Sequence, residues 1–245
     1  MSKYDYNLIA IGGGSAGLVS SYIAAAVKAK VALIERHKMG GDCLNTGCVP
    51  SKALLRSAKM LSYAKRAEEF GFRSTNVEFD FATVMERVQS VIKAIEPHDS
   101  IERYESLGVN CYTGEAKILD PHTVEVNGEK LTARAIIVAT GARPMVPPIA
   151  GLKDIDYLTS DNVWDLRELP KKLVVLGGGP IGSELAQAFA RLGSQVTMVE
   201  MAPQILARED QEVIELAAKK FESDGITILT NHKAKAFQEG SVICE

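Results

Sequence analysis

One supersecondary pattern occurs twice in the 245-residue chain, and it restricts the possible folds more than any other feature. In the first copy the apolar run 8–11 leads into a glycine-rich loop, a helix-favouring stretch follows over 18–30, and a second apolar run ends at Glu35. In the second copy the first apolar run is 173–176 and the closing acid is Glu200. Short apolar runs that alternate with helices are typical of parallel strands joined by crossover helices. The repeat predicts an α/β chain with two Rossmann-like domains, doubly wound and three-layered.

The first glycine-rich loop has the spacing G-x-G-x-x-G at Gly12, Gly14 and Gly17. The first glycine permits a tight turn, the second lets the backbone approach a pyrophosphate, and the third allows close packing of helix and sheet. Phosphates can then lie at the helix N-terminus, facing free N–H groups. Glu35 lies 23 residues after Gly12 (35 minus 12), where a carboxylate can accept hydrogen bonds from ribose hydroxyls. The first copy therefore predicts a dinucleotide site.

Several elements are predicted between the two copies. A helix is expected over 52–67, and a helical stretch over 80–107 is expected to break at Pro97. The dipeptide Asn127-Gly128 lies between short strand-like runs and predicts a hairpin. The apolar run 135–139 predicts a buried strand.

The proline- and glycine-containing stretch 144–151 predicts the junction between the domains. We therefore expect one nucleotide domain over 1–148 and a second over 149–245. The second contains a helix pattern at 209–223 and a strand at 226–229. A doubly wound domain needs further strands after these. We accordingly expect the second domain to be incomplete and the chain to be a fragment of a longer protein.

Cys43 and Cys48 lie in the glycine-rich, polar stretch 40–52. Residues five apart on an ideal helix point about 140° apart, so a disulfide between them requires a distorted backbone. Distorted disulfides are more easily reduced, which suits a redox-active pair. Two free core thiols, a zinc half-site and a structural disulfide are the alternatives. Cys111 and Cys244 each lie alone in an apolar strand pattern and are expected to be buried.

Bulk composition excludes some classes of function. A net charge of −3 gives no electrostatic basis for binding nucleic acid or an anionic membrane. No apolar run approaches the ~20 residues of a membrane helix. The N-terminus leads directly into a strand pattern, so no signal peptide is expected. Four cysteines in a chain of this length do not make a disulfide scaffold, and a reducing, cytoplasmic location is expected.

The stretch 40–52, together with both glycine loops, resembles the FAD-dependent pyridine nucleotide-disulfide oxidoreductases. This family includes dihydrolipoamide dehydrogenase, glutathione reductase and mercuric reductase, and the resemblance covers the whole chain. It implies that the first domain binds FAD and the second binds a nicotinamide cofactor. The implied FAD-binding residues are Gly12, Gly14, Ser15, Ala16, Gly17, Glu35, Arg36, Gly41, Asp42, Lys52, Gly114, Ala116, Thr140 and Gly141. The implied nicotinamide-cofactor residues are Gly177, Gly179, Ile181, Gly182 and Glu200.

The resemblance also implies a catalytic order. Electrons would pass from the nicotinamide to the flavin, then to a Cys43–Cys48 disulfide, and on to a thiol, disulfide or metal-ion substrate. Cys48 would be the charge-transfer thiol and Cys43 the interchange thiol, and Lys52 would lie by the flavin and pair with Glu184. Because thiolates are the reactive form, we expect the pKa of Cys43 to be lowered below ~8.5.

Glu200 lies 23 residues after Gly177 (200 minus 177), and a carboxylate there would repel a 2′-phosphate, so NADH is expected over NADPH. The chain departs from the family at Asp42, where members often carry threonine, and a carboxylate beside a pyrophosphate is unfavourable.

The family's later Gly-Asp segment and its C-terminal dimerisation domain, with a catalytic histidine, are not in this sequence. The longer protein is expected to be a homodimer. One alternative is a nucleotide-binding fragment without turnover, and another is a flavoprotein of the same fold that does not use thiols.

Overall fold

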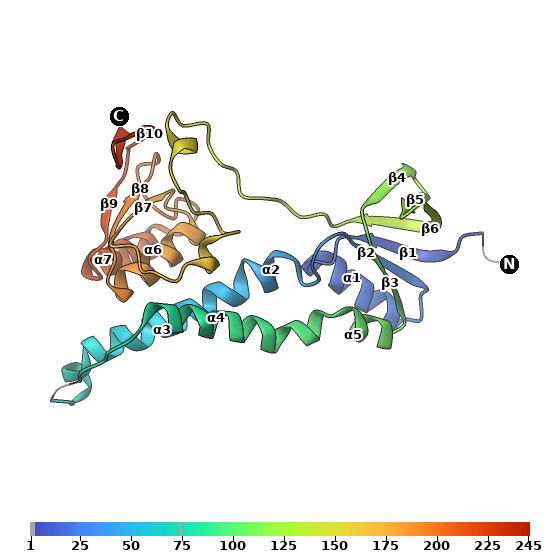
Figure 1. Ribbon diagram of the computed structural model, residues 1–245, viewed down its shortest axis with the longest axis horizontal. Helices are drawn as coiled ribbons and strands as arrows, with labels where there is room; N and C mark the ends of the chain where they lie inside the picture. Colours follow the sequence, from blue (N-terminus) through green and yellow to red (C-terminus); the bar gives the residue numbers. More distant parts are fainter. Residues whose placement is uncertain (1–2, 74) are drawn as a thin grey trace. The chain divides into compact units, whose positions relative to one another are not determined.

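The computed structural model describes residues 3–73 and 75–245 (Figure 1). The chain divides into two compact units. The first comprises Met1–Pro50 and Gln89–Arg143, and the second comprises Ser51–Val88 and Pro144–Glu245. The segment Ser51–Val88 thus belongs to the second unit, although the sequence places it within 1–148. The functional domain boundaries stay a prediction.

The first unit contains a mixed sheet of six strands. Its order is β3-β2-β1-β6-β5-β4, and the first four strands pair in parallel. The strands are β1 (Tyr6–Ile11), β2 (Val31–Glu35), β3 (Val109–Thr113), β4 (Ala116–Asp120), β5 (Thr123–Val126) and β6 (Glu129–Val138). In register, Ile9 of β1 faces Ala32 of β2 on one side and Ile136 of β6 on the other. The predicted α/β fold with parallel strands is confirmed.

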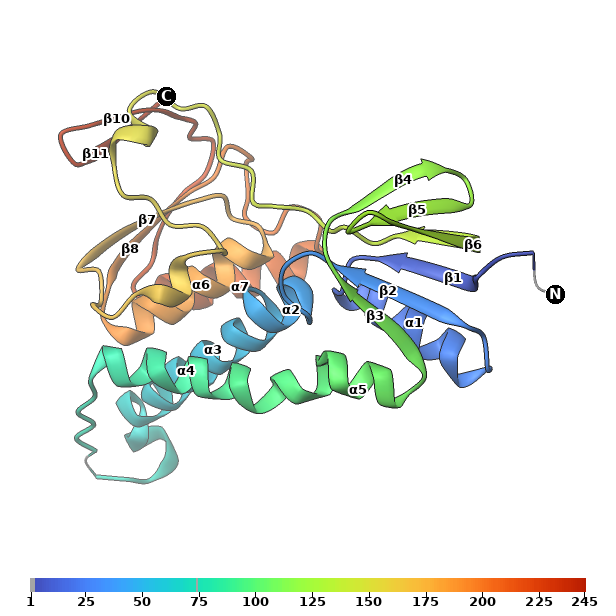
Figure 2. The same cartoon turned by 45° about the vertical axis from the view of Figure 1, so that its right-hand side comes forward.

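Two layers cover the faces of the parallel strands, as Figure 2 shows. Helix α1 (Ser15–Ala26) packs Leu18 and Ala25 against Ala10 and Leu33 on one face. The antiparallel strands β4 and β5 lie over the other face, where Val124 joins the core formed by Ile9 and Ile34. The helix ends earlier than the predicted 18–30, because Lys28 adopts a left-handed φ of 66° and cannot continue it. The result is a three-layered nucleotide-binding architecture.

The hairpin between β5 and β6 is confirmed. Asn127 and Gly128 have φ values of 51° and 81°, as a two-residue hairpin turn with both central residues at positive φ requires. The predicted strand over 135–139 is present within β6, but its expected burial is wrong. Val138 is 62% exposed. Strand β5 pairs with β6 only as far as Thr132, so the end of β6 has a neighbouring strand on the β1 side alone.

The helical segments between β2 and β3 follow the predicted order. They are α2 (Gly41–Asn45), α3 (Cys48–Lys65), the 3₁₀ turn Ala67–Phe70, α4 (Phe81–Ile95), the 3₁₀ turn Glu96–Asp99 and α5 (Ile101–Ser106). The break expected at Pro97 is confirmed, because it lies at the start of the second 3₁₀ turn. The Ser100 side chain caps α5 by accepting a hydrogen bond from the Arg103 N–H at 3.3 Å.

The second unit contains a three-stranded parallel sheet. Its strands, in the order β7-β8-β9, are β7 (Lys172–Leu176), β8 (Gln195–Val199) and β9 (Thr227–Leu229). Helix α6 (Pro180–Leu192) connects the first two, and α7 (Gln211–Ser223) connects the last two. Strands β10 (Ala234–Gln238) and β11 (Ser241–Cys244) form an antiparallel hairpin that the sequence did not predict.

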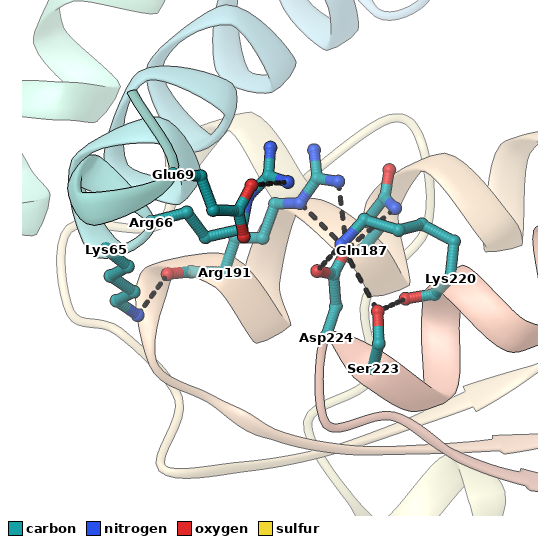
Figure 3. Close-up of polar contacts among 8 residues, drawn as sticks. All are labelled: Lys65, Arg66, Glu69, Gln187, Arg191, Lys220, Ser223 and Asp224. Carbon is teal, nitrogen blue, oxygen red and sulfur yellow. Dashed lines mark hydrogen bonds and ion pairs between the residues drawn. The ribbon is translucent and has the colours of Figure 1, made fainter. Parts of the chain in front are cut away.

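A buried ionic cluster joins α6 to the end of α7 (Figure 3). The Asp224 carboxylate accepts hydrogen bonds from Gln187 Nε2 and Arg191 Nε, both at 2.9 Å, and from Lys220 Nζ at 2.6 Å. Its side chain is only 7% exposed. On the other side of α6, Lys65 Nζ of α3 donates to the Arg191 carbonyl oxygen at 3.0 Å. Helix α6 is therefore held at its C-terminal end from two directions.

None of the helices in the described part of the chain combines the length and apolar character that crossing a bilayer requires.

Candidate functional site

The first glycine-rich loop leaves no space for side chains at two of its glycines. Gly12 has a φ of 111°, and a Cβ there would overlap the carbonyl oxygen of Ala139 at the end of β6. A Cβ on Gly17 would overlap the Gly12 carbonyl oxygen. The loop therefore turns tightly between β1 and α1 and packs the helix close to the sheet, as the spacing predicts.

Glu35 closes this loop from the end of β2. Its carboxylate accepts the Gly13 N–H at 2.6 Å and the His37 N–H at 2.7 Å. The sequence indicated Glu35 but not these two amides, because backbone donors leave no signal in residue type. The carboxylate is thereby fixed at the loop, and its remaining lone pairs can accept hydrogen bonds from ribose hydroxyls.

The second loop repeats this construction in the second unit. Gly177 has a φ of 100°, and a Cβ on Gly182 would overlap the Gly177 carbonyl oxygen. The Glu200 carboxylate accepts the Gly178 N–H at 2.7 Å and the Ala202 N–H at 2.8 Å. The same residue types thus produce the same hydrogen bonds in both units.

Both loops end at an uncapped helix N-terminus. Gly14 precedes α1 and Gly179 precedes α6, and neither helix has a side-chain cap in the described chain. The first-turn N–H groups, including those of Ser15 and Ala16, are therefore available to an anion, with the positive end of the helix dipole behind them. Ile181 lies in the first turn of α6 and is 67% exposed.

The cysteine segment is packed directly on the first loop. The Gly40 N–H donates to the Gly13 carbonyl oxygen at 2.8 Å. Gly40 and Gly41 have φ values of 86° and 54°, and a Cβ on Gly41 would lie 2.5 Å from Gly14 Cα. These close contacts fix the start of α2, and hence the cysteine segment, against the predicted phosphate site. The glycine pair is the sequence signal for this approach.

The two cysteines lie on separate helices. Cys43 is in α2, which ends at Asn45, and Cys48 begins α3. The expected departure from a regular helix between them is thus confirmed, with Thr46 at a φ of −137°. Cys43 is half-buried and Cys48 is exposed, and the two are not joined by a disulfide in this structure. No group of three or more histidine, cysteine or acidic side chains in the described residues is arranged to hold a metal ion.

The expected lowering of the Cys43 pKa is wrong. A hydrogen bond with the Cys48 thiol, followed by burial, raises the pKa of Cys43 above its usual value. The Ser15 side chain acts in the opposite direction but is outweighed. The proximity of Ser15 to this thiol was not apparent from the sequence.

Lys52 and Glu184 form a close ion pair in the second unit. The Lys52 ammonium lies 2.7 Å from both carboxylate oxygens of Glu184. Lys52 is in the second turn of α3, and Glu184 is in the second turn of α6. The pair therefore joins the helix that carries Cys48 at its start to the helix that follows the second glycine loop.

The remaining predicted residues lie around the carboxyl ends of the first unit's strands. The Gly114 N–H donates to the Glu35 carbonyl oxygen at 2.9 Å, and Ala116 begins β4. Arg36 lies 3.6 Å from Glu115 in an exposed ion pair. Thr140 and Gly141 follow β6 and are exposed, beyond the Ala139 residue that contacts Gly12. Cys111 and Cys244 lie in strands, as predicted, but are half-buried rather than buried.

Comparisons with known proteins agree with this geometry. The family described as pyridine nucleotide-disulphide oxidoreductase matches residues 6–244. A mercuric reductase from Bacillus cereus is 38% identical over 93% of this chain and 36% of its own length. A dihydrolipoyl dehydrogenase from Acholeplasma laidlawii is 38% identical over 99% of this chain and 73% of its own length.

A solved structure is also similar. The HOCl-induced flavoprotein disulfide reductase RclA from Escherichia coli matches with a TM-score of 0.81 and 28% identity, over 98% of this chain and 54% of that one. The chain thus spans about half of RclA and between 36% and 42% of the first mercuric reductases it matches. With two matching loops, the cysteine pair and a family match along nearly its whole length, this chain belongs to the pyridine nucleotide-disulphide oxidoreductase family.

Proposed function

We propose that the chain is the nucleotide-binding part of an FAD-dependent disulfide oxidoreductase that uses NADH. Members of the family are flavin-dependent and take electrons from NAD(P)H. The observation that carries the proposal is the packing of the cysteine segment on the first loop through Gly13, Gly14, Gly40 and Gly41. This packing supports a redox-capable thiol pair next to the loop that would bind the dinucleotide.

The residues of the first loop fit the FAD pyrophosphate and ribose. The first-turn N–H groups of α1 would hold the phosphates, Glu35 would accept hydrogen bonds from the ribose hydroxyls, and the absence of a side chain at Gly14 would let the backbone approach the pyrophosphate. When bound, the flavin supplies a two-electron carrier between nicotinamide and sulfur. Asp42 is also among the residues implied to bind FAD, but its negative charge does not suit a neighbouring phosphate.

The second loop would bind the nicotinamide cofactor in the same manner. Glu200 supports NADH over NADPH, because a carboxylate already fixed by two backbone N–H groups cannot turn away from a 2′-phosphate. Coulomb repulsion between the two groups would disfavour NADPH. The Lys52–Glu184 pair would place a cation at the start of the cysteine-bearing helix, where it can stabilise negative charge on a reduced neighbour.

The cysteine pair would alternate between a disulfide and a dithiol. Two electrons and two protons convert the Cys43–Cys48 disulfide into two thiols, with NADH and one solvent proton as their source. Cys48, the first residue of α3, would be the charge-transfer thiol, and Cys43 in α2 would be the thiol that meets the substrate.

The substrate class is a disulfide, a thiol or a thiophilic metal ion. Relatives are named mercuric reductase and dihydrolipoyl dehydrogenase, and RclA has been described as a Cu(II) complex. The longer protein would act as a homodimer. A second candidate function is nucleotide binding without turnover, which is favoured by the chain's coverage of about two fifths of the first mercuric reductases.

The visible spectrum of the purified chain during anaerobic NADH titration tests the proposal. Flavin bands near one equivalent, with a long-wavelength band that grows as NADH is added, would support the relay. Flavin that binds without this band would support the second candidate, nucleotide binding without turnover. A chain that takes up no FAD under saturating conditions would contradict the proposal.

Substituting Cys48 tests the assignment of the two thiols. Cys48→Ser should abolish the long-wavelength band because the charge-transfer sulfur is gone. Cys43→Ser is the matched control and should retain or strengthen the band, since it leaves Cys48 unable to form the disulfide. Survival of the band in Cys48→Ser would reverse the assignment.

A further inference from the structure

Asp42 is held close to the predicted phosphate site by its neighbour. A Cβ on the preceding residue, Gly41, would lie 2.5 Å from Gly14 Cα, and the Gly40–Gly13 hydrogen bond fixes this approach at 2.8 Å. Adjacent Cα atoms are about 3.8 Å apart across a trans peptide, so Asp42 Cα lies within about 8 Å of Gly14 Cα. The carboxylate of Asp42 is therefore within Coulomb range of any anion bound at the N-terminus of α1.

Nothing in the described loop offsets this charge. Residues 12–18 contain only glycine, serine, alanine and leucine, with no lysine or arginine. Asp42 itself is exposed and makes no ion pair or side-chain hydrogen bond within residues 3–73 and 75–245. Glu35 differs, because both of its oxygens already accept backbone N–H groups. Residues 12–18 would therefore hold an anion through N–H groups and the helix dipole alone, while Asp42 adds a carboxylate that has no ion-pair partner in the described chain.

We propose that Asp42 is a negative determinant of cofactor affinity, which makes the first loop bind FAD more weakly than its N–H groups alone would allow. The inference rests on the proposed function, since it takes the FAD pyrophosphate as the anion. For two like charges about 8 Å apart, an effective dielectric constant between about 60 and about 20 corresponds to roughly three- to thirtyfold in an equilibrium constant.

A purely structural role for Asp42, as a residue that stabilises α2, predicts no gain in FAD affinity when its charge is removed. Asp42 is in the first turn of α2, where an acidic side chain interacts favourably with the helix dipole. If this were its only role, neutralising it would loosen α2 and leave FAD affinity unchanged or lower. Salt distinguishes the two, since electrostatic repulsion at an exposed site is screened when the Debye length falls from about 30 Å at 0.01 M to about 3 Å at 1 M.

The test is an FAD titration of the cofactor-free chain, followed by the quenching of flavin fluorescence, at about 0.01 M and about 1 M NaCl. The variants are Asp42→Asn and Asp42→Thr. Glu105→Gln is the matched control, because it removes one exposed charge from α5 at the amino-terminal edge of the same sheet. Both Asp42 variants should bind FAD roughly three- to thirtyfold more tightly at low salt, with the difference closing at high salt. The control should match the parent chain.

Equal or weaker FAD binding by both Asp42 variants would overturn the inference while leaving the proposed function intact. A gain that persists unchanged at 1 M NaCl would also overturn it, because the gain would not be electrostatic. Failure of every chain, parent and variants alike, to take up FAD would instead overturn the proposed FAD site and this inference with it.

Discussion

Replacing Asp224 by asparagine should destabilise the second unit strongly. The substitution keeps the shape of the side chain but removes the charge that holds Arg191 and Lys220. Breaking a buried ion pair by removing one partner costs about 3–5 kcal/mol. Lys220 is 40% exposed and can turn to water, whereas Arg191 is 14% exposed and cannot do so freely. We therefore expect a loss of about 3 kcal/mol in the free energy of unfolding.

Urea unfolding followed by tryptophan fluorescence measures this loss. Trp164 is the chain's only tryptophan, it is 4% exposed, and it lies in the second unit. With an m-value of about 1–3 kcal/mol per molar urea, the unfolding midpoint should fall by roughly 1–3 M. Glu69→Gln is the control, because it removes an exposed ion pair with Arg66 from the same region (Figure 3) and should cost under about 0.5 kcal/mol.

The pH dependence supplies an independent check. Burial opposes ionisation of Asp224, but the hydrogen bonds and charges of Lys220 and Arg191 outweigh it and hold the pKa of this carboxyl below its usual value. Its stabilisation is therefore present above the unfolded-state pKa of about 3.9 and is lost as the pH falls through the lower folded-state pKa. The difference between Asp224→Asn and the parent should be constant from about pH 5 to 8 and shrink below about pH 4. A midpoint shift no larger than that of Glu69→Gln would refute this account of the cluster.

Three further predictions concern the thiols and the glycine loops. Burial raises the pKa of the Cys111 thiol to about 11, so iodoacetamide should label it slowly in the folded chain at pH 8 and faster toward pH 11; mass spectrometry showing labelling as fast as in urea would contradict this. Gly17→Ala forces a Cβ into the Gly12 carbonyl oxygen and should lower the free energy of unfolding by more than about 2 kcal/mol. Gly179→Ala is the control, because a Cβ there meets nothing within 4 Å and should cost under about 1 kcal/mol. Equal losses in urea unfolding would count against the steric argument. Glu200→Ser should raise the ratio of NADPH to NADH affinity about tenfold in equilibrium titrations, and an unchanged ratio would remove Glu200 as the selecting group.

Features encoded by short-range signals were predictable from the sequence. The Asn127-Gly128 turn requires two positive φ angles, the break at Pro97 follows from a missing N–H donor, and the two loops follow from glycine spacing. The position of Glu35 at the end of its strand was predicted for the same reason. Each of these depends on a few neighbouring residues.

Features that depend on distant partners were not predictable. The hairpin of β10 and β11 turns at Glu239-Gly240, both at positive φ, but glutamate is not one of the residues that favour this turn, as asparagine and aspartate do. The exposure of Val138 depends on where β5 stops pairing with β6. The raised pKa of Cys43 depends on the Cys48 thiol and on burial, which residue spacing alone does not give. Electrostatic environment is the least local of these properties.

The central position of β1 has a consequence for how this chain is made. Strand β1 pairs with β2 within its first 35 residues, but its other edge pairs with β6, and Asp5 and Thr132 beside that pairing are 127 positions apart. At a synthesis rate of about 5–20 residues per second, one edge of β1 stays unpaired for several seconds until β6 has been synthesised. Non-local parallel pairing of this kind is slow to form. The first unit can therefore complete its sheet only after α3 and α4 have left the ribosome. Its folding during synthesis depends on how the unpaired edge of β1 is protected from other chains until then.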